Sequence, residues 1–303
     1  MRCVVPISPG QPMERRFFGS KIGRTARGIL LAMGVGTAAV VAGVWWHGWG
    51  SPTGPDAQAR PAPSPPPLEN ANRSHPLYPA LELARRIEQR ISSQIHDYRA
   101  TLVKRERIGS EIREEHLQVK IRHEPFSVYV CRLDAQGQPG DEGIFVDGRN
   151  DNKLIGYTKS FPGRLLGTVA IDPRGSIAMT NQHYPITEIG ILNLSRRIIE
   201  IVQEDMAHEE CQVAFHETEL NGRPVTCVEV VHPQRRPYFR FHLGRVYLDR
   251  QLDVPLRYEA YDWPTESGGQ PELIEQYTYR DLELNVGLSD RDFDPKNPEY
   301  HFP

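Results

Sequence analysis

Short stretches in which apolar and polar residues alternate fill most of the chain after residue 110. In one of them Leu117, Val119 and Ile121 alternate with polar residues, and the pattern returns at intervals up to residue 286. Successive side chains of a strand point to opposite faces, so each stretch predicts a strand with one buried and one wet face. About ten such strands are predicted, and their one-sided pattern is typical of an antiparallel sheet with one covered face.

The dipeptide Asn221-Gly222 predicts a tight hairpin, because a two-residue type I′ turn needs positive φ at both positions. In the register that this turn sets, Phe215 faces Val228 and Val213 faces Val230. One face of the hairpin is therefore consistently apolar.

A further strand is expected where Phe239, Phe241 and Leu243 alternate with polar residues. The apolar phase then changes at Gly244, which suggests a β-bulge at this glycine.

Two amphipathic helices complete the pattern. The first starts near Pro79, and its apolar residues recur at spacings of three and four. They are Ala84, Ile87, Ile91, Ile95 and Tyr98. The second is expected over residues 187–206, with a broad apolar stripe. The predicted fold class is α+β: a curved antiparallel sheet or incomplete β-barrel of about ten strands, with two main helices covering its concave face.

The N-terminal part has the pattern of a membrane anchor. Residues 28–46 carry no charge, and a helix of that length spans about one bilayer core. Residues 1–27 hold six basic residues against one glutamate, a net charge of +5, which predicts a cytoplasmic N-terminus. The alternative is a cleaved signal peptide, for which residues 57–59 supply an A-x-A match.

Four regions follow from these patterns. Residues 1–27 are a basic cytoplasmic segment, 28–47 the transmembrane anchor or signal peptide, 48–80 a proline-rich disordered tether, and 81–303 a β-rich domain. Residues 51–80 contain nine prolines and no apolar periodicity. The total net charge of −3 leaves −8 for the residues after 27, which argues against a nucleic-acid partner.

No common catalytic motif occurs, neither G-x-S-x-G nor H-E-x-x-H nor a P-loop, so no catalytic residue, metal site or cofactor is predicted. Cys211 lies near His208, but the hairpin register places this thiol on the apolar face, which favours a buried structural cysteine. The same register puts Cys211 and Cys227 on opposite faces and disfavours a disulfide between them. Cys131 lacks an evident partner.

The inner face of the sheet supplies the candidate ligand cavity. Ten residues are assigned to it: Val128, Val130, Val213, Phe215, Val228, Val230, Phe239, Phe241, Leu256 and Tyr258. The second helix is expected to act as a lid through Ile191, Leu194, Ile198 and Val202. Residues 104–107 are four charges in a row and are expected in the first strand. Lys104 and Glu106 share one face of it, either as a polar contact at the cavity rim or as charges that protect an edge strand.

Residues 244–263, GRVYLDRQLDVPLRYEAYDW, resemble the strand, turn and strand pattern of LolA-like and LolB-like lipoprotein-carrier domains. Together with FVDGRNDNKLIGY, YPITEIGILNL, HPQRRPYFRFH and DFDPKNPEYHF, the segment is similar to an uncharacterised bacterial family of single-pass anchored proteins. The carrier resemblance implies a half-open β-barrel whose concave apolar face, covered by helices, takes acyl chains. A soluble carrier must diffuse, whereas this chain carries an apparent anchor.

These observations give one functional hypothesis and two alternatives. The hypothesis is a membrane-tethered extracytoplasmic module that binds a lipid, a lipoprotein acyl chain or another apolar ligand. The alternatives are a non-catalytic envelope scaffold or protein-interaction domain and, last, a hydrolase. The expected place is the inner membrane, with a single span and the C-terminal domain in the periplasm or outside.

Alkaline phosphatase fused after Pro79 should be active in a bacterial host, because the enzyme needs an oxidising, exported compartment. Enzyme activity normalised to the amount of fusion protein tests the orientation. A stable but inactive fusion would contradict it.

Overall fold

The computed structural model describes residues 73–266 and 268–303, which form one antiparallel sheet of eleven strands with two main helices. The strand order is β6-β5-β4-β3-β2-β1-β11-β10-β9-β8-β7, so the sheet stays open between β6 and β7. The predicted α+β class with an unclosed curved sheet is confirmed. The strands are β1 (Asp97–Ile108), β2 (Glu111–Arg122), β3 (Ser127–Leu133), β4 (Pro139–Val146), β5 (Leu154–Tyr157), β6 (Val169–Ile171), β7 (Gln212–Leu220), β8 (Arg223–Val231), β9 (Leu243–Asp249), β10 (Pro255–Asp262) and β11 (Glu272–Leu284).

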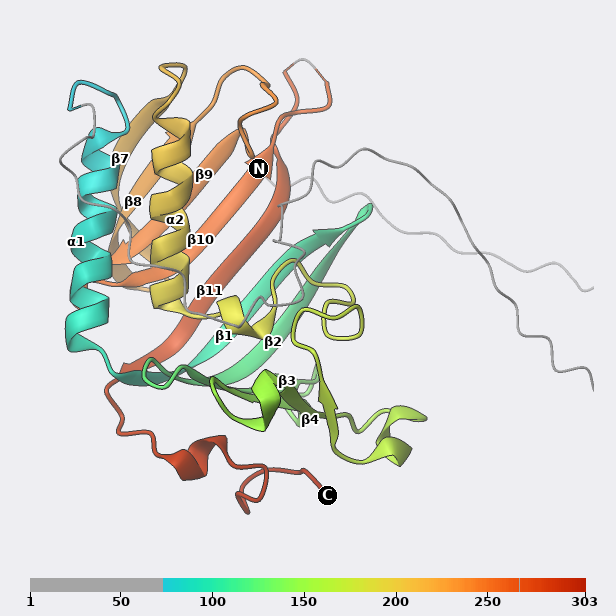
Figure 1. Cartoon of the computed structure of the whole chain (residues 1–303). Helices are drawn as coiled ribbons and strands as arrows, with labels where there is room; N and C mark the ends of the chain where they lie inside the picture. Colours follow the sequence, from blue (N-terminus) through green and yellow to red (C-terminus); the bar gives the residue numbers. More distant parts are fainter. Residues whose placement is uncertain (1–72, 267) are drawn as a thin grey trace, which may run out of the picture. The chain divides into compact units, whose positions relative to one another are not determined.

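Helices α1 (Tyr78–Gln94) and α2 (Ile191–Asp205) lie side by side in front of the half of the sheet made by β7–β10 (Figure 1). α1 includes Pro79 as predicted, and residues 78–80, assigned to the tether, are helical. The helix ends before Ile95, which is extended, so the prediction that Tyr98 belongs to it is wrong. Tyr98 lies in β1, where period 2 replaces period 3.6.

α2 begins later than predicted. Gly190 precedes it at φ +118°, and a Cβ here would lie 2.9 Å from the hydroxyl oxygen of Tyr98. The hydroxyl accepts a hydrogen bond from the backbone N–H of Ile191 at 2.9 Å. This contact fixes the first turn of α2 on β1, and only glycine leaves room for it.

The hairpin of β7 and β8 has the predicted register. Phe215 pairs with Val228 and Val213 with Val230, and Asn221 and Gly222 have φ values of 52° and 76°. Cys131, Cys211 and Cys227 are buried and free of disulfides, and the register disfavours a bond between the last two.

Phe239 and Phe241 are buried but lie in the loop before β9, so the strand predicted around them is wrong. The predicted bulge at Gly244 is also wrong, because Gly244 pairs regularly with Val230 on one side and Ala260 on the other. The alternation of apolar and polar residues changes there because strand β9 begins at Leu243. Gly244 is needed for space, since a Cβ would lie 2.8 Å from Cε2 of Phe241.

Apolar side chains hold the helices on the concave face. Ile87, Ile91 and Ile191 are fully or almost fully buried in one cluster with residues of β1–β3 and β8–β11, and Ile199 is buried in a second cluster with Phe239. On the opposite face, the C-terminal segment after β11 packs on β3, where the ring of Tyr300 stacks on Tyr129 with centroids 3.9 Å apart.

Within residues 73–266 and 268–303, neither helix has the length and apolar character needed to cross a membrane. The predicted span at 28–46 and most of the predicted tether lie outside the described residues.

Replacing Gly244 by alanine should destabilise the domain by about 1–3 kcal/mol, because the added methyl group meets a buried aromatic ring. Chemical denaturation measures the change. Gly156→Ala is the matched control: it is also a strand glycine, but its Cβ would meet Cγ2 of Val169 at an ordinary 3.8 Å. Equal stability of the two variants would contradict the packing argument.

Candidate functional site

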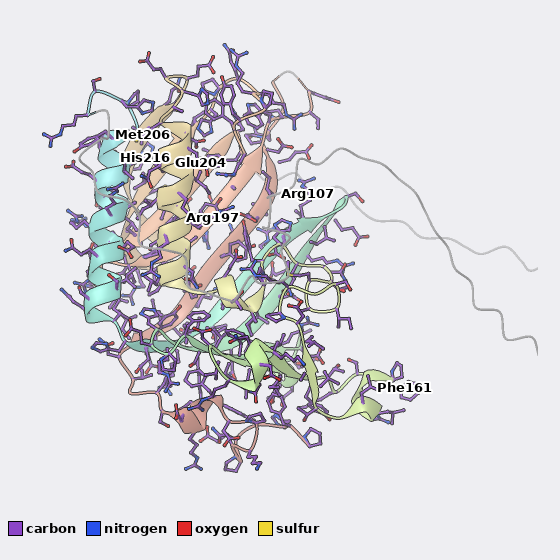
Figure 2. The ribbon with its side chains drawn as sticks, in the orientation of Figure 1. Arg107, Phe161, Arg197, Glu204, Met206 and His216 are labelled. Carbon is purple, nitrogen blue, oxygen red and sulfur yellow. The ribbon has the colours of Figure 1, made fainter. Side chains whose placement is uncertain are left out.

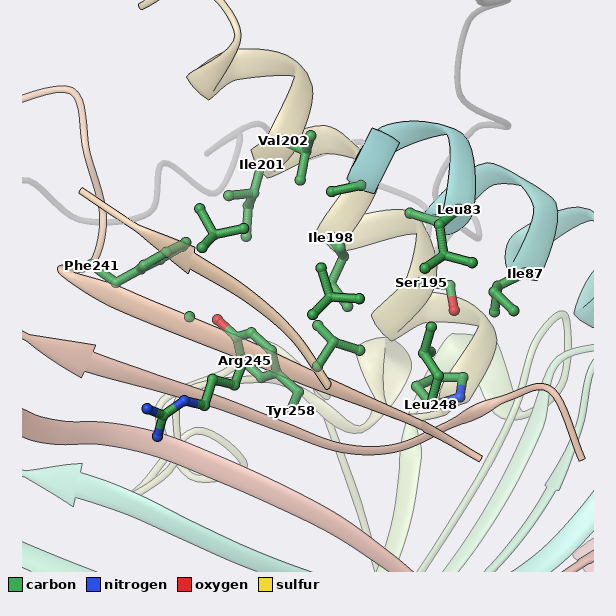
Figure 3. Close-up of a pocket in the computed structure, with 17 residues that line it drawn as sticks. Leu83, Ile87, Ser195, Ile198, Ile201, Val202, Phe241, Arg245, Leu248 and Tyr258 are labelled. Atoms are coloured by element: carbon green, nitrogen blue, oxygen red, sulfur yellow. The ribbon is translucent and has the colours of Figure 1, made fainter. Parts of the chain in front are cut away.

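A cavity of about 60 Å³ lies between α1, α2 and strands β8–β10 (Figure 3). Its lining is almost wholly hydrocarbon. α1 contributes Ala80, Leu83, Ala84 and Ile87; α2 contributes Ser195, Ile198, Ile201 and Val202; the sheet and the loop before β9 contribute Val228, Val230, Phe241, Gly244, Arg245, Val246, Leu248, Pro255 and Tyr258.

Helical and strand periodicity together explain this lining. The α1 residues recur at three and four positions, so they form one face of the helix. The strand residues alternate, as Val228 and Val230 do, so they share the concave face. The cavity remains where small side chains, among them Ala84 and Gly244, face each other across the two layers.

The structure brings only some of the predicted cavity residues together. Val228, Val230, Phe241 and Tyr258 line the cavity, as do the predicted lid residues Ile198 and Val202. The others lie elsewhere: Val128, Leu256, Phe239 and Ile191 are buried in the surrounding core, and Val130, Val213 and Leu194 pack at its margins.

Phe215 corrects one prediction. It pairs with Val228, but β7 is an edge strand of the sheet and the side chain is 44% exposed. Phe215 therefore shares a face with Val228, as predicted, but it is exposed and does not line the cavity.

The α1 wall of the cavity was not predicted. The apolar stripe with Ala84 and Ile87 identifies the buried face of this helix. The stripe does not distinguish residues that line a cavity from residues that pack in the core. Leu248 and Pro255 were missed for the same reason, because a cavity depends on how two distant segments meet.

The few polar groups in the lining point elsewhere or are already paired. The Ser195 hydroxyl donates to the carbonyl oxygen of Ile191 at 2.8 Å. The guanidinium of Arg245 points away from the cavity, with Nε 2.7 Å from Oε2 of Glu229 (Figure 3). Burial, followed by the charge of Glu275, raises the pKa of Tyr258 well above its usual value, so this phenol stays neutral. The cavity therefore suits hydrocarbon.

Lys104 and Glu106 lie at the centre of the sheet, because β1 pairs with both β2 and β11. The alternative that they protect an edge strand is therefore wrong. Lys104 Nζ lies 3.4 Å from Glu106 Oε2 and 2.8 Å from Glu115 Oε2, and the Tyr277 hydroxyl donates to Glu106. Only 2% of Glu106 is exposed, so the pair belongs to a buried polar network beside the core.

A second carboxylate, Glu275, completes this network. The Tyr184 hydroxyl donates to its Oε1 at 2.8 Å, and Nδ1 of His183 lies 2.8 Å from its Oε2. Nε2 of His183 faces the carbonyl oxygen of Arg107 at 3.1 Å. Both ring nitrogens of His183 thus face acceptors, an arrangement that favours the doubly protonated imidazolium.

Burial raises the pKa of all three cysteine thiols of the described region. Burial, followed by the charges of Asp205 and Glu210, raises the pKa of Cys211 to about 12. Burial also raises the pKa of Cys227 to about 11. Both thiols stay protonated near neutral pH, and only a thiolate attacks or binds metal.

Residues 95–302 match the model of DUF1571, which is described as a protein of unknown function. The chain belongs to this family. The expectation of an uncharacterised family is confirmed by this match, which covers more than half of the chain. No curated protein matches the chain significantly.

Several solved structures resemble this DUF1571 domain at low identity. A DUF1329 family protein from Desulfovibrio piger has 12% identity and a TM-score of 0.36, over 73% of this chain and 98% of that one. Lipoprotein LppX of Mycobacterium tuberculosis has 13% identity and a TM-score of 0.39, over 71% of this chain and 99% of that one. A LolA superfamily protein from Nitrosomonas europaea has 10% identity and a TM-score of 0.30, over 71% of this chain and 97% of that one. At such TM-scores the function has to be inferred from this chain's own residues.

The network around His183 makes stability depend on pH. Burial lowers the pKa of His183, but the hydrogen bond to Glu275 and the charges of Glu275 and Glu106 outweigh it, so the net pKa is raised. Because the pKa of His183 is higher in the folded than in the unfolded chain, its protonation stabilises the folded state. This stabilisation is complete below the unfolded-state pKa of about 6.5 and is lost as the pH rises through the folded-state pKa.

The free energy of unfolding should therefore fall between about pH 6.5 and the raised pKa, and His183→Gln should remove this part of the pH dependence. Denaturant titrations across that range measure it. His96→Gln, at an exposed position, is the control and should keep the wild-type slope. Parallel curves for the wild type and His183→Gln would contradict the assignment.

Proposed function

We propose that the domain formed by the sheet, α1 and α2 binds the hydrocarbon part of a ligand, such as a lipid or a lipoprotein acyl chain, in the cavity beneath the two helices. The observation that carries this proposal is the lining: apolar side chains from two helices and three strands, with the polar groups paired outside it. Ligand sites in proteins are predominantly apolar concave pockets of this kind.

The size of the cavity limits what it holds in this state. A group the size of a water molecule occupies about 10–15 Å³ of such a cavity volume, so the cavity holds on the order of four to six such groups. That fits a short stretch of an acyl chain. A longer chain requires the helices to move away from the sheet. The ion pair between Nε of Arg196 on α2 and Oε1 of Glu88 on α1, at 3.0 Å, favours movement of both helices together.

We also propose that the chain is attached to a membrane. Residues 28–46 would anchor the module in the inner membrane and the proline-rich segment would tether it outside the cytoplasm. The uncharged run, the +5 charge before it and the prolines after it support this. A cleaved signal peptide remains the alternative for the same residues.

A photoactivatable fatty acid, fed to bacteria that express the full chain, tests binding directly. Ultraviolet crosslinking and peptide mapping should place the adducts on α1, α2 and β8–β10, and unlabelled fatty acid should compete. Adducts spread evenly over the surface, or none at all, would overturn the proposal and leave the scaffold alternative.

Ala84→Leu should fill the cavity and separate binding from stability. Cavity filling commonly stabilises by about 0.5–2 kcal/mol, so the unfolding midpoint should rise while crosslinking falls. Gln89→Leu adds the same side chain on the exposed face of α1 and should leave crosslinking unchanged. If Ala84→Leu raises the midpoint but crosslinking persists, the ligand lies elsewhere.

A further inference from the structure

The loop that joins β5 to β6 carries three large apolar side chains on its surface. Phe161, Leu165 and Leu166 are 72%, 71% and 73% exposed. Figure 2 shows Phe161 at the outer end of this loop, away from both helices. A single exposed apolar side chain is ordinary, but three of them within six residues form an apolar tip that needs an explanation.

The tip is built on a defined turn. The Thr158 hydroxyl donates to Oδ1 of Asp141 at 2.6 Å, and Nζ of Lys159 donates to the carbonyl oxygen of Pro139 at 2.8 Å. Within the loop, the N–H of Arg164 donates to the carbonyl oxygen of Ser160 at 2.8 Å. These contacts fix the loop to the start of β4, so the apolar side chains are held out into solvent by structure.

The segment that carries the tip is basic, although acidic residues adjoin it: Asp151 and Asp172 flank it in the sequence and Asp141 contacts Thr158. Residues 153–171 contain Lys153, Lys159 and Arg164 and no acidic residue, a net of +3 in a chain whose total is −3. The guanidinium carbon of Arg164 lies 6.0 Å from the centroid of the Phe161 ring. Apolar side chains with basic neighbours are the combination that binds an anionic bilayer surface.

We propose that this loop docks on a phospholipid bilayer, an inference that rests on the attachment proposed above for residues 28–46. Phe161, Leu165 and Leu166 enter the boundary between headgroups and acyl chains, and the basic residues lie among anionic headgroups. The basic excess favours a bilayer over a protein groove, because an apolar groove alone would gain nothing from it. The surface is independent of the ligand cavity, since β5 and β6 lie at the opposite edge of the sheet from β7 and β8.

The test uses the full chain in anionic nanodiscs, with Cys3→Ser and one added cysteine for an environment-sensitive fluorophore. Cys131, Cys211 and Cys227 are buried and stay unlabelled. Leu165→Cys reports on the tip. Gln136→Cys, at the exposed turn between β3 and β4, is the matched control. Lipids with nitroxide groups should quench the label at 165, more strongly in anionic than in zwitterionic discs, and should leave the label at 136 bright.

Adding Phe161→Ser and Leu166→Ser to the Leu165→Cys chain should abolish the quenching while circular dichroism and the unfolding midpoint stay unchanged, because these side chains are exposed. Equal quenching at 165 and 136 would overturn the proposal. Quenching that survives both serine substitutions, or that needs nitroxide lipids supplied in separate vesicles, would overturn it as well.

Discussion

Burial of the apolar stripes of α1 and α2 against one half of an open sheet is the constraint on which the rest of this structure depends. Ile91 and Ile191 are fully buried there, and one such side chain contributes about 1.5–3 kcal/mol. Two local contacts then fix the helices: the Tyr98 hydroxyl accepts from the first turn of α2, and Arg196 pairs with Glu88 between the helices. The strands outside this cover need other partners, and the C-terminal segment supplies one on the opposite face of β3.

The cavity follows from the size of the residues where the two layers meet. Ala80 and Ala84 on α1, Ser195 on α2 and Gly244 on β9 are all small. At about 24 cal/mol per Å³, a void of this volume costs on the order of 1–2 kcal/mol, which a domain of this size tolerates. A larger side chain at Ala84 would recover that energy and remove the space, whereas Gly244 has no room for one because of Phe241, so small residues keep this opening in an otherwise close-packed layer.

Local patterns predicted the local structure well. The Asn-Gly turn fixed the register of β7 and β8, and period-2 alternation found most strands. The failures have one cause: they depend on partners distant in the chain. β1 pairs with β11, about 170 residues away, so Lys104 and Glu106 are central and buried although their sequence resembles an edge. Phe239 and Phe241 alternate like a strand, yet their burial comes from α2 and a stacked histidine in a loop.

The two proposed surfaces depend on different parts of the sheet. The cavity depends on α1 and α2 and on β8–β10, whereas the apolar tip depends on hydrogen bonds between the β5–β6 loop and β4. β1, β2, β3 and β11 lie between these regions in the sheet, and the buried network of Lys104, Glu106 and Glu275 crosses two of those strands. The two proposed sites therefore share no strand of the sheet. A variant of the tip should therefore leave cavity filling untouched, and a filled cavity should leave the tip as it is.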